Sequence, residues 1–331
     1  MEEYKILPEI VKLGHVALIS QNVEKSLWFF KEVLGLEETK EVDGVHYLRA
    51  WGDFEHHTLS ITAGAESRIE HIAWKAKRRE DVASFAALFE EAGVEVTKIN
   101  DKFEVGQGEA IRFQLPSGHN FEIYYDMERP LGEGDNKSIL RNQPYKAWSK
   151  GVSPRRIDHI NCMTTMSTQI IADFLAEKLG FQMRETIEVP GTDQIVGAWM
   201  NVSPLAHDIA VMSDPRAKST SEVNHLAYWL DDGQDILRAA DILAEAGLKC
   251  IGPGRHGGSR ALYLYVEDPG SGLRIELFTN AYLVLEPDWE PIHWTTEELD
   301  LALTLWGQPV GATDEIMTGI YAGIVKETVK K

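Results

Sequence analysis

Two six-residue stretches, Ile69-Glu-His-Ile-Ala-Trp74 and Val223-Asn-His-Leu-Ala-Tyr228, repeat one pattern in the two halves of the chain. Each places a His among aliphatic and aromatic residues, which is typical of a buried strand. Each His is followed twenty residues later by Glu-Ala-Gly, beginning at Glu91 and Glu245. The chain therefore contains a duplicated unit, and the repeated stretch predicts that the two halves share one fold.

The duplication also repeats a set of polar residues. The gap between the central His and a later Glu is 51 residues in both halves. Two His and one carboxylate that meet in a fold form a set that leaves positions open on a divalent iron. The two sets are His15, His71 and Glu122 in the first half and His159, His225 and Glu276 in the second.

The set in the second half occupies strand interiors, between apolar neighbours. An interior carboxylate is costly unless it is paired or binds a metal. A salt bridge from Glu276 to Arg274 is the alternative, but side chains two apart on a strand share a face without close contact. Each His alone could be an ordinary core residue. Their equivalent places in a repeat favour a metal site.

Four repeats of a strand, a helix and several strands follow along the chain. The helices are expected to end at Gly35, Gly93, Gly180 and Gly247. A Gly- and charge-rich run at 129–137 predicts a linker. The first strands of the four units are expected at 13–19, 70–75, 156–163 and 223–230. We expect two domains, 1–140 and 150–285, and a tail at 286–331 that covers the second domain.

The composition excludes several classes of protein. The 331 residues carry 33 basic and 52 acidic side chains, a net charge of −19, which argues against nucleic acid and anionic membranes as partners. Two cysteines, Cys162 and Cys250, give no disulfide framework and fit a reducing cytoplasm. The acidic N-terminus is followed by no apolar run, so we expect neither a signal peptide nor a membrane span.

Four βαβββ units in two pairs resemble the vicinal oxygen chelate superfamily, the α+β fold of glyoxalases, bleomycin resistance proteins and dioxygenases. Within it, the second half resembles the type I extradiol ring-cleaving dioxygenases. The resemblance is carried by Trp199 in Ala198-Trp-Met200, His207 in Leu205-Ala-His-Asp-Ile209, His256 in Gly252-Pro-Gly-Arg-His-Gly-Gly258, and Tyr265 in Leu262-Tyr-Leu-Tyr265.

The resemblance implies cleavage of a catechol by dioxygen at a metal held by the second-half set, with Fe(II) as the first choice and Mn(II) also accepted. It implies that His207 is the acid–base residue and that His256 and Tyr265 contact the catechol oxygens. Asn161 would lie beside the oxygen site and Trp199 in the pocket wall. A cytoplasmic homotetramer that degrades aromatic compounds is the expected assembly.

The first half lacks most of these surrounding residues. Ala17 stands where the second half has Asn161, Ile111 stands for Tyr265, and the loop Gly106-Gln-Gly108 contains no His, although His57 is present. We therefore expect the first half to be a non-catalytic copy that binds no metal.

The substrate is expected to be an uncharged catechol: catechol itself, an alkyl- or chlorocatechol, or 2,3-dihydroxybiphenyl. The homoprotocatechuate 2,3-dioxygenases carry an arginine where this chain has Ile251, and an arginine pair where it has Leu301-Ala-Leu-Thr-Leu-Trp306. Apolar residues there would leave a substrate carboxylate unpaired. Homoprotocatechuate 2,3-dioxygenase, 4-hydroxyphenylpyruvate dioxygenase and a non-enzymatic metal-dependent binding protein are the alternatives.

Overall fold

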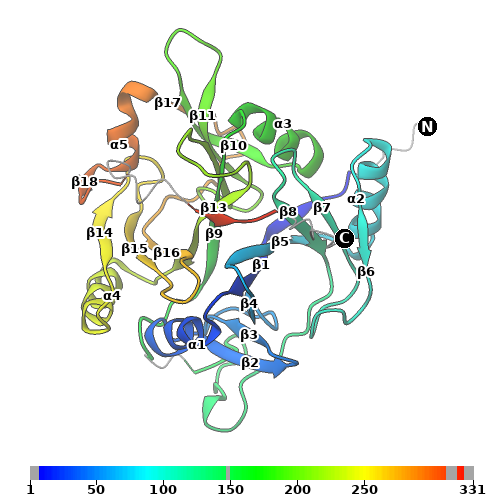
Figure 1. The fold of residues 1–331 in the computed structure, drawn as a ribbon, viewed down its shortest axis with the longest axis vertical. Helices are drawn as coiled ribbons and strands as arrows, with labels where there is room; N and C mark the ends of the chain where they lie inside the picture. The colour runs from blue at the N-terminus through cyan, green and yellow to red at the C-terminus, as the bar shows by residue number, and fades with distance from the viewer. Residues whose placement is uncertain (1–6, 147–149, 311–318, 324–331) are drawn as a thin grey trace.

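The computed structural model describes residues 7–146, 150–310 and 319–323. The strands form the interior and the helices lie around the periphery (Figure 1). The N-terminal six residues and parts of the expected tail, 311–318 and 324–331, lie outside the described residues. Within the described ranges, no helix has the length and apolar character needed to cross a membrane.

All four units share one pairing pattern, which confirms the predicted fold class. The first strand of each unit pairs in parallel with its last strand, and the last three strands pair antiparallel in sequence order. The first strands of two units then join antiparallel, β1 with β5 and β9 with β13, to make each domain.

The first domain contains two of these units. Its first unit comprises β1 (Ile10–Ser20), α1 (Val23–Leu27) with a π-helical continuation η1 (Trp28–Val33), β2 (Glu37–Val42), β3 (Val45–Arg49) and β4 (Leu59–Ala63). Its second unit comprises β5 (Arg68–Ala76), α2 (Arg79–Glu91), β6 (Thr97–Ile99), β7 (Ala110–Gln114) and β8 (Asn120–Tyr124). A 3₁₀ turn, η2 (Gly134–Asn136), lies in the connection to the second domain.

The second domain repeats the arrangement. Its units comprise β9 (Arg156–Thr164), α3 (Thr168–Leu179), β10 (Gln182–Glu188), β11 (Ile195–Asn201) and β12 (Ile209–Ser213), then β13 (Glu222–Trp229), α4 (Gly233–Glu245), β14 (Cys250–Arg255), β15 (Leu262–Glu267) and β16 (Arg274–Thr279). Local sequence sets the helix ends: Asp232 caps α4 by accepting from the Gln234 and Asp235 amides, and Gly180 ends α3 with φ 77°.

The strand registers are equivalent in the two domains, so equivalent residues reach equivalent places. Successive side chains on a strand point to opposite faces, and residues of one parity therefore share a face. The paired residues are Ala17 with His71 and Ala73 with Glu122 in the first domain, and Asn161 with His225 and Ala227 with Glu276 in the second.

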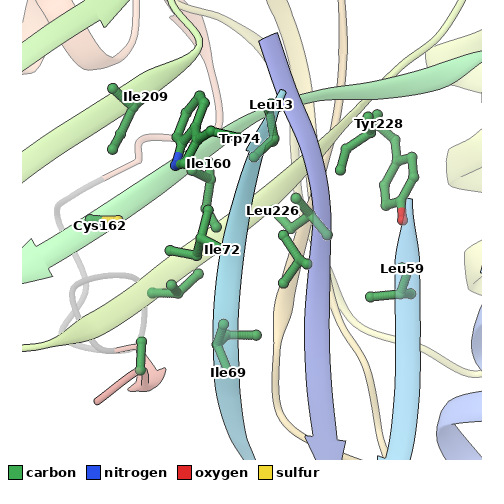
Figure 2. Packing of buried hydrophobic residues seen from close by; sticks show 14 of the residues in the cluster. Leu13, Leu59, Ile69, Ile72, Trp74, Ile160, Cys162, Ile209, Leu226 and Tyr228 are labelled. Atoms are coloured by element: carbon green, nitrogen blue, oxygen red, sulfur yellow. The ribbon is translucent and has the colours of Figure 1, made fainter. Parts of the chain in front are cut away.

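The alternate residues of these strands, whose side chains point to the opposite face, form one hydrophobic core between the domains. Ile72 and Trp74 of β5 lie near Ile160 of β9 and Leu226 of β13 (Figure 2), and all four are fully buried members of one cluster. The central strands are thus buried on both faces. One face holds the domains together, and the other carries the His and Glu sets.

The tail contacts both domains. It contains β17 (Ile292–Thr295), η3 (Thr296–Glu298), α5 (Leu299–Leu303), β18 (Trp306–Gly307) and β19 (Ile320–Tyr321). β17 pairs with β10 and β18 pairs with β14, over the second domain. β19, the red strand in the middle of Figure 1, pairs with β13 and also with β5 of the first domain, a contact that the sequence did not predict.

Candidate active site

Three side chains of the second domain converge at one point. His159 comes from β9, His225 from β13 and Glu276 from β16, and their exposed fractions are 1%, 6% and 1%. The Glu276 Oε2 atom lies 2.9 Å from His159 Nε2 and 3.2 Å from His225 Nε2. The predicted set therefore meets in space, and one ligand atom from each residue can contact a single ion.

Each imidazole is oriented by the residue that precedes it. His159 Nδ1 lies 2.8 Å from Asp158 Oδ1, and His225 Nδ1 lies 2.8 Å from Asn224 Oδ1. Both oxygens accept, so each Nδ1 donates, and each Nε2 is thereby directed at Glu276. Acceptors on the far ring nitrogen are the usual companions of metal-binding His, because they fix the tautomer.

The electrostatics of Glu276 favour its charged form. Burial opposes ionisation, but His225 and the hydrogen bonds from His159, His225 and His256 outweigh it and hold the pKa of Glu276 well below its usual value. A buried carboxylate beside two imidazoles is a donor set for a divalent cation.

A cavity opens beside the three converging residues. It is bounded by the sheet of the second domain and by the tail. Its walls combine aromatic and aliphatic side chains with a few polar groups, as small-molecule sites do. The lining residues are His159, Asn161, Met163, Glu185, Trp199, His207, Met212, Asn224, His225, His256, Gly258, Ser259, Tyr265, Glu276, Phe278, Trp294, Ala302, Leu303 and Val310.

His207 lies against the first His of the set. Its ring centroid is 4.1 Å from that of His159, and only 5% of the residue is exposed. Burial lowers the pKa of His207 well below its ordinary value, and neighbouring His159 lowers it further. His207 is therefore neutral and faces the cavity, a state suited to proton exchange with a bound molecule.

His256 and Tyr265 form a hydrogen-bonded pair at the cavity wall. His256 Nδ1 donates to the Leu303 carbonyl at 2.5 Å, which directs Nε2 to the Tyr265 hydroxyl at 3.2 Å and to Glu276 Oε1 at 3.1 Å. Burial and the nearby Glu276 carboxylate raise the pKa of Tyr265 well above its ordinary value. Its hydroxyl thus stays protonated and can donate.

The remaining predicted pocket residues divide into two groups. Asn161 and Trp199 line the cavity, and the buried Asn161 Oδ1 has no hydrogen-bond partner in the structure. Ile251 is not among the lining residues. It packs behind the wall, against the cluster of Met163, Tyr263, Tyr265 and Val310.

The structure also brings in residues that the sequence did not single out. The Glu185 carboxylate accepts from the Ser259 amide at 2.7 Å, the Tyr282 hydroxyl at 2.6 Å and Trp294 Nε1 at 2.7 Å. It thereby fastens the tail to the rim of the cavity. Of the tail leucines, Leu303 reaches the cavity. No pattern near β10 marks Glu185, because its partners lie 74 to 109 residues away.

In the first domain, His15, His71 and Glu122 also come together, with Glu104 as a fourth member. Here Glu122 is held by Arg112 Nε at 2.6 Å and Gln107 Nε2 at 2.7 Å. Glu104 was not predicted, because it lies in a loop without a recognisable motif.

Two family models match the chain. Residues 69–128 match the catechol 2,3-dioxygenase-like N-terminal domain. Residues 156–277, which include the three converging residues of the second domain, match the glyoxalase/bleomycin resistance protein/dioxygenase superfamily.

Similar proteins extend this match to nearly the full length. The chain is 50% identical over 312 residues to a manganese-dependent 2,3-dihydroxybiphenyl 1,2-dioxygenase of Geobacillus genomosp. 3, covering 93% of this chain and 98% of that protein. It is 37% identical to a metapyrocatechase of Geobacillus stearothermophilus, covering 88% of each. The substrate complex of homoprotocatechuate 2,3-dioxygenase from Brevibacterium fuscum superposes with a TM-score of 0.83, at 27% identity and 98% and 99% coverage. The chain therefore belongs to the extradiol dioxygenases of the vicinal oxygen chelate superfamily, enzymes that cleave catechols with dioxygen.

Proposed function

We propose that the second domain, residues 150–285, is the catalytic domain and that His159, His225 and Glu276 bind its divalent metal. The first domain, residues 1–140, has no catalytic role. The observation that carries this proposal is the convergence of two imidazoles and one carboxylate beside a cavity. The donor set fits Fe(II) and Mn(II) alike. We propose Mn(II), since the relative at 50% identity is named manganese-dependent.

His159, His225 and Glu276 would hold the divalent ion, which would supply Lewis acidity toward a catechol hydroxyl and a route for electron transfer from the ring to dioxygen. The protein residues then position the substrate and move protons. Asn161, with its free buried Oδ1, borders the dioxygen side.

His256 and Tyr265 orient the catechol. The protonated Tyr265 hydroxyl donates to one catechol oxygen. The hydrogen bond from His256 Nδ1 to the Leu303 carbonyl aims Nε2 into the cavity, where it hydrogen-bonds the other catechol oxygen. His256 Nε2 and the Tyr265 hydroxyl lie 3.2 Å apart, so together they can recognise two vicinal oxygens.

His207 is the acid–base residue of the proposal. It is neutral in the free protein and none of the described protein groups hydrogen-bonds to its ring nitrogens, so they are available to a ligand. Once it has accepted a proton, it can return that proton to an oxygen as the O–O bond breaks.

The substrate is an uncharged catechol with an apolar or aromatic substituent, such as 2,3-dihydroxybiphenyl or catechol itself. Trp199, Phe278, Trp294 and Leu303 line the cavity, and no Lys or Arg of the described chain does so. Its one carboxylate outside the metal set is Glu185, which would repel a carboxylated substrate. Removing a carboxylate from water into this cavity without a cation is costly.

Comparison of substrates tests this specificity. We expect kcat/KM for 2,3-dihydroxybiphenyl or catechol to exceed that for 3,4-dihydroxyphenylacetate by at least about tenfold, or roughly 1.4 kcal/mol. The yellow ring-cleavage product gives the rate directly. A preference for the carboxylated substrate would overturn the proposal.

A pair of substitutions in one helix sharpens the test. Leu303 faces the cavity, whereas Leu301 is 47% exposed. Leu303→Arg should shift the kcat/KM ratio toward 3,4-dihydroxyphenylacetate by about tenfold, because it supplies the missing cation. Leu301→Arg is the matched control and should leave the ratio unchanged. An equal effect of both changes would show that long-range charge alone decides the ratio.

The ligand assignment is tested by Glu276→Gln. We expect turnover of every catechol to fall below detection while the circular dichroism spectrum is retained. Glu128→Gln, an exposed carboxylate of the first domain, is the control and should keep full activity. Residual turnover above a few per cent in Glu276→Gln would contradict the assignment.

We also propose a homotetramer in the cytoplasm. The resemblance to the extradiol dioxygenases supports the assembly, and the free thiols Cys162 and Cys250 support a reducing compartment. Light scattering of the purified protein measures the assembly, and a monomer would refute it.

A further inference from the structure

We propose that the first domain binds a second, non-catalytic divalent cation, best suited to Zn²⁺, through His15, His57, His71 and Glu104. This site goes beyond the function proposed for the second domain and does not depend on it. It also departs from the expectation drawn from sequence, which considered His15, His71 and Glu122 without Glu104.

The imidazole nitrogens lie around the two carboxylate oxygens of Glu104 at separations close to those around a shared ion. His15 Nε2 lies 3.1 Å from His71 Nε2 and 3.4 Å from Glu104 Oε2. His71 Nε2 lies 3.3 Å from Glu104 Oε1, and His57 Nε2 lies 3.6 Å from Glu104 Oε2. Ligands at Zn²⁺ distances of about 2.0–2.2 Å in a tetrahedron lie roughly 3.3–3.6 Å apart. The observed separations lie at or close to this range.

Two of these atoms have no hydrogen bond. His57 Nε2 and Glu104 Oε2 are buried and unpartnered, in residues that are 0% and 8% exposed. A buried polar atom without a partner is costly. A proton shared between His15 and His71 would satisfy that pair and leave the other two atoms unpartnered. A cation at the common centre satisfies all four.

The surrounding charges favour a divalent cation. Glu104 and Glu122 are buried carboxylates, and Arg112 contacts both. Half-exposed Glu70 lies 3.9 Å from the same guanidinium. Three carboxylates and one arginine leave two negative charges, which a divalent ion neutralises. The Glu122 carboxylate already accepts hydrogen bonds from Arg112 and Gln107. It therefore adds negative charge beside the site without binding the ion.

The positions of His57 and Glu104 explain why this site has no position open for a substrate. His57 precedes β4 by two residues, as His207 precedes β12, and Glu104 lies in the β6–β7 loop, as His256 lies between β14 and β15. The proposed acid–base and substrate-binding positions of the second domain are thus occupied by metal ligands in the first. Four protein ligands without an open position make a structural site, whereas three with an open position make a catalytic one.

Metal analysis of the full-length protein tests the proposal. After expression with manganese, iron and zinc supplied, we expect two metal equivalents per chain. Glu276→Gln should lose activity and retain one equivalent, and Glu104→Gln should lose one equivalent and keep the catalytic one. Glu128→Gln, in the same domain, should keep both. A single equivalent in the wild type, none in Glu276→Gln or an unchanged content in Glu104→Gln would each overturn the proposal.

Anomalous diffraction from wild-type crystals, recorded at the zinc and manganese edges, does not depend on how the variants fold. The expected result is a peak between His15, His57, His71 and Glu104 in addition to a peak at Glu276. A peak at Glu276 alone would refute the second site. Since Glu276→Gln and Glu104→Gln remove different ions, failure of this inference is distinguishable from failure of the proposed active site.

Discussion

The neighbours of each histidine determine what that histidine can do. His159 and His225 each donate from Nδ1 to the residue before them in sequence, which directs Nε2 at Glu276. His256 donates from Nδ1 to a backbone carbonyl, which directs its Nε2 at Tyr265 and Glu276. His207 has no such partner among the described residues, and burial lowers its pKa. On the proposed assignment, one residue type would supply metal ligands, a substrate contact and a proton carrier within a single site.

His207→Asn tests the proton carrier. We expect metal and substrate binding to persist while turnover falls by about 10²–10⁴-fold, the usual contribution of a general acid–base group. Asn is similar in size and polar, but it cannot exchange a proton. Steady-state kinetics at saturating oxygen and metal analysis measure the two effects. His46→Asn, in a half-buried His that pairs with Glu38, is the control and should retain full turnover. Near-normal turnover of His207→Asn would remove His207 from the mechanism.

The tail is held at the rim of the cavity by the carboxylate of Glu185. Glu185, on β10, accepts hydrogen bonds from Tyr282 and Trp294, so it fastens the tail at both sides of the connection from β16 to β17. Trp294 and Leu303, which follow, then close the cavity. Glu185 thus joins a strand of the second domain to the segment that covers the cavity.

Glu185→Ala should loosen this cover. The Trp294 and Tyr282 donors and the Ser259 amide would lose their acceptor, at about 1–3 kcal/mol for each group left unsatisfied. We expect a higher KM for the catechol and faster proteolytic cleavage between residues 282 and 303, with the second domain otherwise intact. Limited proteolysis with mass spectrometry locates the cuts. Glu188→Ala is the control, because this partly exposed neighbour hydrogen-bonds His293 at the outer edge. Equal cleavage in both variants would refute the anchoring role.

Sequence periodicity was sufficient for the elements that carry buried, patterned residues. The four first strands and four helix ends were predicted because apolar runs and glycines mark them. The edge strands β2 and β6 were not, since most of their residues are at least partly exposed and show little apolar alternation. At the site, a repeated spacing revealed the triad, and the resemblance supplied His207, His256 and Tyr265. Glu185 and Leu303 act through contacts between distant segments, which local patterns do not encode.

The whole molecule is held by one core that runs between the domains. Ile72, Trp74, Ile160 and Leu226 belong to a single buried cluster. Trp74 of the first domain packs edge-on against Phe181 of the second, with ring centroids 4.9 Å apart. Neither domain can expose this face without losing hydrophobic burial, so the two halves stabilise each other.

We therefore expect one cooperative thermal transition for the two domains. Removing bound metal with a chelator should lower its midpoint by on the order of 5 °C, because a ligand at a hundred times its Kd stabilises the native state by about 2.7 kcal/mol. Differential scanning calorimetry with and without chelator measures this shift. Two separate transitions, with only one sensitive to chelator, would show that the domains unfold independently.

The pairing of β19 with β13 and β5 also imposes an order on biosynthesis. A ribosome makes β19 after every other strand that the structure describes, when the strands of both domains have already left the peptidyl transferase centre. Domains fold as units as they emerge, the N-terminal one first. The contact of β19 with β13 and β5 is therefore the last strand pairing of the described chain that can form during synthesis.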